Sequence, residues 1–137
     1  MRYEVGGVEA DKLHEECGVF GIYAPGRDVA QLTYYALYAL QHRGQESAGI
    51  AVSDGKSIKC EKGVGLVAEV FQDTDKFKQL QGNMAVGHVR YATDTSELLI
   101  NAQPLLVRYR NGHLAIAHNG NLINSRQLRS QLESKGS

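Results

Sequence analysis

The sequence predicts an α+β fold with antiparallel sheets. Segments of strand and helix character follow one another in the order strand, helix, hairpin, helix, several strands, helix, which is typical of that class. Two dipeptides, Asp54-Gly55 and Asn111-Gly112, indicate tight hairpins, because the central residues of such turns need a positive φ. The 15 glycines among 137 residues agree with a chain that is rich in turns and strands.

The first half of the chain divides into a strand, a helix, a hairpin and a second helical segment. The apolar run CGVFGIYA is broken by Pro25, as a strand is before a turn. Asp28 is a suitable N-cap, and apolar residues recur at helical spacing after it, so a helix should begin there. The predicted elements are a strand over residues 17–24, a helix over 29–40, strands over 48–54 and 57–62, and a helical segment over 67–80.

The second half is predicted to be β-rich and to close with a helix. Asn124 is a suitable N-cap with Gln127 three residues later, and Leu128 and Leu132 then share one face of the helix. No strand follows to cover this helix, so we expect an incomplete domain. The predicted elements are a strand over residues 84–93, a loop over 94–104, strands over 105–110 and 113–119, and a helix over 124–135.

Composition excludes several classes of function. A net charge of zero gives no electrostatic footprint for nucleic acid or for an anionic membrane, so a small molecule is the expected ligand. Residues 1–16 hold five acidic residues and no apolar run, so they are neither a signal peptide nor a membrane anchor. Two cysteines, Cys17 and Cys60, fit the reducing cytoplasm. No histidine stands at zinc-ligand spacing, so we predict no metal and no cofactor.

Cys17 raises the question of catalysis. A cysteine at the start of a strand is most often a small buried hydrophobe. As a nucleophile it would need a base, because a thiol with an ordinary pKa of about 8.5 is mostly protonated at neutral pH. No histidine is obviously placed to serve. If the bond before Cys17 were cut, however, its own α-amino group, with a pKa near ~8, would become a suitable base. Residues 1–16 would then be a propeptide that caps this base.

Five segments in order along the chain carry a resemblance to a known family. CGVFGI, LQHRGQESAGI, GHVRYAT, NAQP and AHNGNL resemble the signature segments of the class II glutamine amidotransferases, the N-terminal-nucleophile glutaminases. The match runs from residue 17 to about residue 124. The resemblance implies an αββα sandwich of two antiparallel sheets between helices. It also implies that residues 17–137 are a partial glutamine amidotransferase domain.

The resemblance assigns catalytic roles to three residues. Cys17 corresponds to the nucleophile, which opens a central strand in this class. The side-chain amide of Asn119 and the backbone N–H of Gly120 correspond to the oxyanion hole.

The resemblance also assigns residues to the substrate. Arg90 corresponds to the residue that binds the α-carboxylate of glutamine, and Thr93 adds a hydroxyl to the same carboxylate. Arg43 and His88 are expected to hold these binding residues in place without contacting the substrate. Asp94 departs from the usual pattern of the loop that follows Thr93. The aspartate with which the class binds the α-ammonium group would lie beyond the last residue of this sequence.

Within the class, the segments are most similar to the branch whose second domain is a phosphoribosyltransferase of purine synthesis. His42 and Tyr91 favour this branch over the glucosamine-6-phosphate synthases, which have tyrosine and tryptophan there. The expected partners are glutamine and a phosphoribosyltransferase domain downstream or in another chain, and a homo-oligomer is compatible with the sequence. The alternatives are another class II amidotransferase, a glutaminase-like binding module without turnover, and another N-terminal-nucleophile hydrolase such as an acylase.

Overall fold

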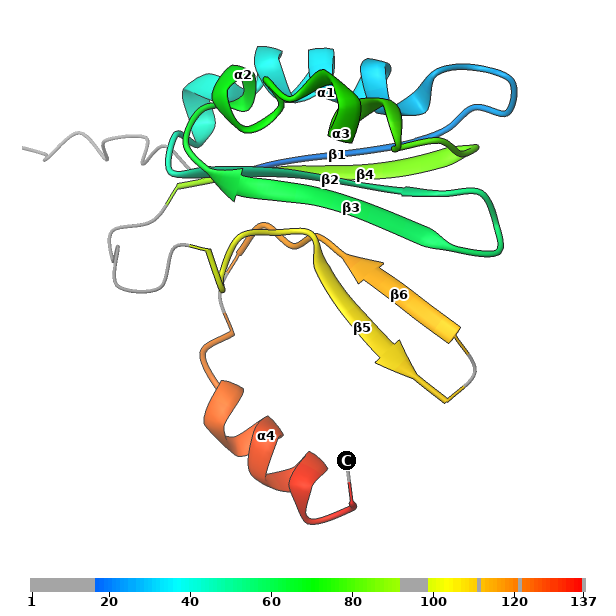
Figure 1. The fold of residues 1–137 in the computed structure, drawn as a ribbon. Helices are drawn as coiled ribbons and strands as arrows, with labels where there is room; N and C mark the ends of the chain where they lie inside the picture. Colours follow the sequence, from blue (N-terminus) through cyan, green and yellow to red (C-terminus); the bar gives the residue numbers. More distant parts are fainter. Residues whose placement is uncertain (1–16, 92–98, 111, 121, 137) are drawn as a thin grey trace, which may run out of the picture.

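A four-stranded antiparallel sheet is the centre of the fold (Figure 1). The computed structural model describes residues 17–91, 99–110, 112–120 and 122–136, so the predicted propeptide lies outside the described residues. The strands follow the order β1-β4-β2-β3, which places β1 and β2 on either side of β4. Their bounds are β1 Gly18–Tyr23, β2 Ser47–Ser53, β3 Ile58–Val64 and β4 Met84–Arg90.

Helix α1 (Val29–Ala39) packs on one face of this sheet and forms the core with it. Asp28 caps the helix as predicted, because its carboxylate accepts a hydrogen bond from the backbone N–H of Gln31 at 3.0 Å. The helix buries Leu37 completely against the sheet, where Ile50 and Val89 are also fully buried. Removing this apolar surface from water stabilises the pairing of helix and sheet.

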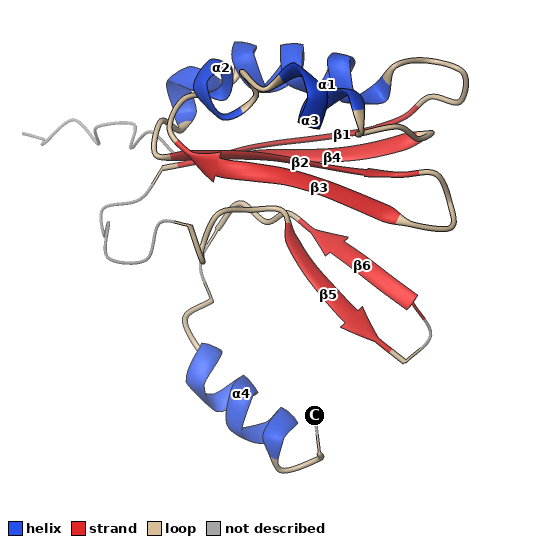
Figure 2. Cartoon of the chain, in the orientation of Figure 1, coloured by secondary structure: helices blue, strands red, loops and turns tan. Residues whose placement is uncertain are grey.

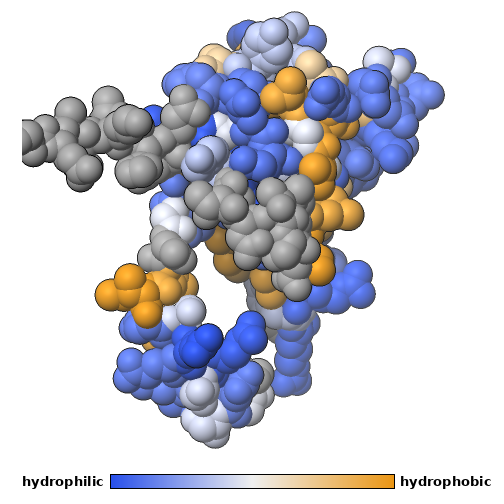
Figure 3. Space-filling model, turned by 90° about the vertical axis from the view of Figure 1, so that its left-hand side faces the viewer, coloured by the Kyte–Doolittle hydropathy of each residue, from blue (hydrophilic) through white to orange (hydrophobic). Residues whose placement is uncertain are grey.

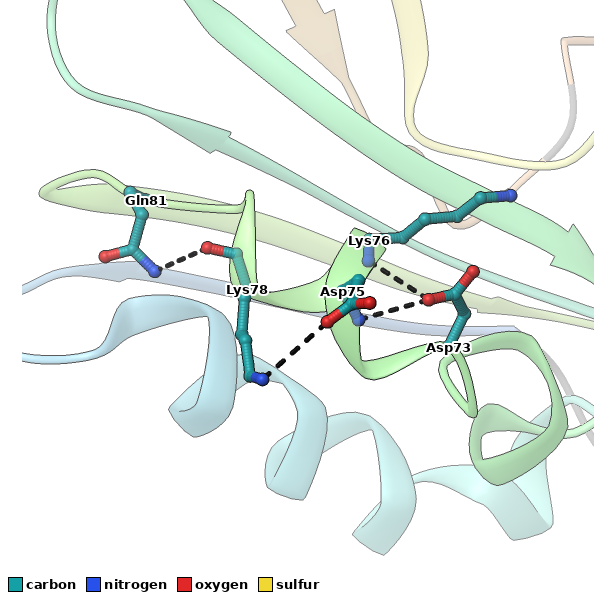
Figure 4. A network of polar contacts seen from close by, with 5 residues as sticks. All are labelled: Asp73, Asp75, Lys76, Lys78 and Gln81. Atoms are coloured by element: carbon teal, nitrogen blue, oxygen red, sulfur yellow. Dashed lines mark hydrogen bonds and ion pairs between the residues drawn. The ribbon is translucent and has the colours of Figure 1, made fainter.

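The predicted helical segment over residues 67–80 is two short helices, α2 (Val67–Val70) and α3 (Thr74–Lys78). The break has a local cause, which Figure 4 shows. The carboxylate of Asp73 accepts hydrogen bonds from the backbone N–H groups of Asp75 and Lys76, so Asp73 begins a new helix and does not continue the first one. Together with α1, both helices lie above the sheet in Figure 1.

A hairpin of β5 (Leu105–Tyr109) and β6 (Gly112–Ile116) lies on the opposite side of the sheet, and α4 (Ser125–Glu133) follows it (Figure 2). Residues of β5 and of α4 are exposed throughout. Asn124 occupies the N-cap position of α4 as predicted, but its side chain makes no capping hydrogen bond, so the predicted capping interaction is wrong.

The described residues therefore confirm the predicted class of antiparallel sheets with helices. They contain one helix-on-sheet layer pair and a second, two-stranded sheet. On the face shown in Figure 3, the lower part of the molecule is mostly hydrophilic and carries one hydrophobic patch. No helix among the described residues is long and apolar enough to cross a membrane.

Candidate active site

Strand register places three of the predicted site residues, Cys17, His88 and Arg90, on the face of the sheet that α1 leaves free. A Cβ placed on Gly87 would meet Thr33 and Leu37 of α1, so Gly87 faces the helix. Its neighbour His88 therefore faces the other way, and so does Arg90, because successive residues of a strand point to opposite faces. Gly18 pairs with Val89, which puts Cys17 beside Arg90 at the end of β4.

The thiol of Cys17 lies against the backbone of Tyr91. The Tyr91 N–H donates a hydrogen bond to Sγ at 3.3 Å, and the thiol lies 3.5 Å from the Tyr91 carbonyl, to which it can donate. These two contacts fix the position of the sulfur at the end of β4.

The carbonyl oxygen of Cys17 joins three distant segments. The side-chain amide of Asn119 donates a hydrogen bond to it at 2.6 Å, and Nε of Arg43 donates to it at 3.4 Å. Asn119 and Cys17 are 102 positions apart in the sequence, so this contact exists only because the loop after β6 folds back to the start of β1. The structure thus brings together the predicted nucleophile, one predicted oxyanion donor and one predicted supporting residue.

Gly120, the second predicted oxyanion residue, follows Asn119 in a conformation that favours glycine. Its φ is 140°, and an added Cβ would lie 3.2 Å from the imidazole of His118. A side chain at this position would be strained. This geometry is compatible with a backbone N–H that approaches a ligand closely.

The guanidinium of Arg90 lies partly inside the protein. Its Nη1 is inaccessible to solvent and has no hydrogen-bond partner among the described residues. An unpaired buried guanidinium N–H is costly, so such a group is normally satisfied by a partner. Thr93, the other residue predicted to bind the carboxylate, lies outside the described residues.

His88 is fully buried and holds the backbone just before Asn119. Its Nε2 lies 3.2 Å from the carbonyl oxygen of His118, and because a carbonyl can only accept, Nε2 carries the proton. Burial is the main cause that lowers the pKa of His88 to about 4; the positive charge of Arg90 contributes in the same direction, and the hydrogen bond to His118 opposes it. His88 is therefore a neutral supporting residue at neutral pH.

None of the four described histidines forms a hydrogen bond with the sulfur of Cys17. The other cysteine is unsuited to nucleophilic chemistry, because burial raises the pKa of the Cys60 thiol to about 11 and keeps it protonated.

The buried neutral state of His88 predicts a dependence of stability on pH. Between pH 6.5 and about 4 the unfolded chain binds a proton at His88 that the folded protein does not, so the free energy of unfolding should fall as the pH falls. The full effect is about 3 kcal/mol. Urea denaturation of the wild type and of His88→Gln, which does not titrate, should show a difference in stability that changes by this amount across the window. A parallel loss in both proteins would contradict the assignment.

Two features of the site were not predicted from the sequence. The backbone N–H and carbonyl of Tyr91 both contact the sulfur of Cys17, and no pattern of side chains in the sequence predicts such a contact. Gln103 hydrogen bonds both backbone groups of His118, next to Asn119. Gln103 belongs to the NAQP segment, which carried the family resemblance but received no role.

A scan against protein-family models finds no match. The chain is 56% identical over 130 residues to an amidophosphoribosyltransferase of Synechocystis, covering 95% of this chain and 26% of the relative. It is 53% identical over 130 residues to the amidophosphoribosyltransferase of Bacillus subtilis, covering 94% of this chain and 27% of the relative.

Solved structures give the same result. One described as the allosteric regulatory enzyme of purine biosynthesis matches with a TM-score of 0.79 and 52% identity, over 87% of this chain and 25% of that one. The glutamine phosphoribosylpyrophosphate amidotransferase of Bacillus subtilis, complexed with ADP and GMP, matches with a TM-score of 0.69 and 49% identity, over 89% of this chain and 25% of that one.

The antiparallel sheets, with a cysteine directly ahead of β1, are those of a class II glutamine amidotransferase domain, as the motifs predicted. The chain spans about a quarter of the length of the curated relatives that it matches. It belongs to the amidophosphoribosyltransferase family, in which it corresponds to the N-terminal part.

Proposed function

We propose that this chain is the glutaminase part of an amidophosphoribosyltransferase. It hydrolyses the side-chain amide of glutamine to glutamate and supplies the ammonia to a phosphoribosyltransferase domain in the rest of the protein, for purine synthesis. The identity to named amidophosphoribosyltransferases over nearly the whole chain supports this reaction. The cytoplasm, which keeps Cys17 reduced, is the compartment that we infer.

Acylation of Cys17 is the first half of the reaction. The free α-amino group of Cys17 takes the thiol proton while Sγ attacks the carbonyl carbon of the glutamine side chain. The carbonyl oxygen becomes an oxyanion, which Asn119 and the N–H of Gly120 stabilise by hydrogen bonds. The nitrogen–carbon bond then breaks, the α-ammonium group returns its proton to the leaving nitrogen, and ammonia departs.

Hydrolysis of the thioester is the second half. A water molecule attacks the acyl carbon, and the α-amino group of Cys17 takes one of its protons. The carbon–sulfur bond breaks, the proton passes to Sγ, and glutamate leaves. Glutamine and water are thereby converted to glutamate and ammonia, and the enzyme returns to its starting state.

This mechanism requires the removal of residues 1–16, because the nitrogen of Cys17 is a non-basic amide until the bond after Glu16 is cut. The next methionine after Met1 is Met84, so trimming of an initiator methionine cannot expose Cys17. Cys17 itself is the suitable agent for the cut. Its thiol attacks the Glu16 carbonyl, the peptide bond shifts to a thioester, and water releases the leader.

One observation carries the proposal: the Asn119 amide donates a hydrogen bond to the carbonyl of Cys17, and the strand register places Arg90, whose Nη1 is buried and unpaired among the described residues, beside Cys17. The full-length protein should release ammonia and glutamate from L-glutamine. It should act poorly on 4-aminobutanamide, which has the same side-chain amide but no α-carboxylate. Equal rates on both would favour a general acylase, and binding of glutamine without release would favour a binding module.

Arg90→Lys tests the recognition of the carboxylate. Lysine keeps the charge but loses the flat double donor that matches a carboxylate, so KM for glutamine should rise about tenfold or more with little change in kcat. Steady-state kinetics of glutamine hydrolysis measures both constants. Arg27→Lys, at an exposed arginine ahead of α1, is the matched control and should leave both unchanged. An unchanged KM in folded Arg90→Lys would remove Arg90 from the substrate site.

A further inference from the structure

We propose that Gln103 is a positioning residue for the oxyanion hole, an inference that rests on the proposed glutaminase function. Its side-chain carboxamide holds the backbone of His118, the residue directly before Asn119 and Gly120. Gln103 does not touch Cys17 or Arg90 by a hydrogen bond. We infer that it acts on the reaction only through the loop that it holds.

The segment that carries Gln103 is fixed to the sheet by two features. A Cβ on Gly49 would collide with the carbonyl oxygen of Gln103, so this glycine in β2 is what allows the segment to lie directly on the sheet. Lys62 of β3 donates hydrogen bonds from Nζ to the carbonyl oxygens of Ala102 at 2.6 Å and of Pro104 at 3.3 Å. The backbone on both sides of Gln103 is therefore anchored.

The carboxamide of Gln103 satisfies both backbone groups of His118. Its Oε1 accepts from the His118 N–H at 2.6 Å, and its Nε2 donates to the His118 carbonyl at 3.1 Å. A carboxamide presents a donor and an acceptor as a neighbouring peptide group would, so Gln103 replaces a strand partner for His118. Glutamate at this position could only accept when ionised, and an apolar side chain could do neither.

His88 adds a second donor to the same carbonyl. The imidazole Nε2 lies 3.2 Å from the His118 oxygen, so this oxygen accepts from Gln103 and from the buried His88 together. Three hydrogen bonds thus fix one residue of a loop whose other residues are largely exposed. The restraint lies next to the two predicted oxyanion donors, Asn119 and Gly120.

The consequence for catalysis follows from geometry. The Asn119 amide reaches Cys17 from the segment that Gln103 restrains, and Nδ2 has two N–H groups, of which the Cys17 carbonyl takes one. The second is available for the oxyanion. An oxyanion donor acts only when it is held where charge develops, so a looser His118 should reduce turnover more than substrate binding.

Two variants of the full-length protein test the inference. Gln103→Glu keeps the acceptor and loses the donor, and Gln103→Met keeps the length and loses both. Each should lower kcat for glutamine hydrolysis about ten- to hundredfold and leave KM within about threefold. Gln31→Glu, at an exposed glutamine of α1, is the matched control and should be unchanged.

The affinities for two ligands distinguish a positioning role of Gln103 from a merely structural one. Glutamate γ-semialdehyde forms a hemithioacetal with the thiol, whose new oxygen needs the oxyanion donors, whereas glutamate needs mainly the carboxylate clamp. In both variants the affinity for the aldehyde should fall with kcat, and glutamate affinity should stay close to that of the wild type. Variants with wild-type kcat, or with equal losses of both affinities, would overturn the inference. A wild-type protein that does not hydrolyse glutamine would overturn the proposed function itself.

Discussion

Asn119→Asp should lower the turnover of glutamine by about two or more orders of magnitude while the protein remains folded. The substitution replaces a hydrogen-bond donor by an anion of the same shape, beside the point where the reaction develops negative charge. In the structure the Asn119 amide donates a hydrogen bond to the Cys17 carbonyl at 2.6 Å. An aspartate carboxylate there would face the Cys17 carbonyl oxygen, and the two oxygens would repel each other even before the reaction begins. Steady-state glutaminase assays at saturating glutamine measure the loss.

A matched control separates this effect from a general cost of the charge. Asn83 is exposed and precedes β4, at the end of that strand opposite to Arg90. Asn83→Asp makes the same chemical change there and should keep wild-type turnover. Wild-type turnover in Asn119→Asp would return Asn119 to the role of a turn residue.

Cys17→Ala should lower glutamine-dependent activity by about four orders of magnitude or more, because no covalent intermediate can form. In the full-length protein, free ammonia supplied in the assay should still support the synthesis step, since that step consumes ammonia and does not use the thiol of Cys17. The measurement is a comparison of the product formed with glutamine and with ammonium chloride.

Cys60→Ala is the control, because the half-buried Cys60 lies in β3 and its thiol stays protonated at neutral pH. It should retain both activities. If Cys17→Ala lost the ammonia-dependent reaction together with the glutamine-dependent one, a purely glutaminase role for Cys17 would be contradicted.

Most of the fold could be predicted because its signals are local. Asp28 marks the start of α1, and the Asp54-Gly55 turn separates β2 from β3. The division of residues 67–80 was missed, since Asp73 reads equally well as a polar residue within one helix and as the cap of a second. The unsatisfied N-cap of α4 was missed because capping depends on a side-chain rotamer that the sequence does not specify.

The sequence points to side chains of the candidate site but not to its backbone contacts. Three of the predicted residues lie in the motif segments, and the structure brings them together at the carbonyl of Cys17: Cys17 itself, Asn119 and Arg43. The N–H of Tyr91 beside the sulfur has no signature, because every residue other than proline offers the same group. The contact of Gln103 with His118 arises from the packing of two loops, which only the three-dimensional arrangement determines.

The central claim is that Cys17 uses its own α-amino group as the base, and one measurement tests it most directly. Intact mass and glutaminase rate are followed on the same samples of the full-length protein as it matures. We expect that residues 1–16 are lost, that Cys17→Ala retains them, and that the rate of ammonia release rises in proportion to the cleaved fraction. Full-rate hydrolysis of glutamine by protein that still carries residues 1–16 would contradict it.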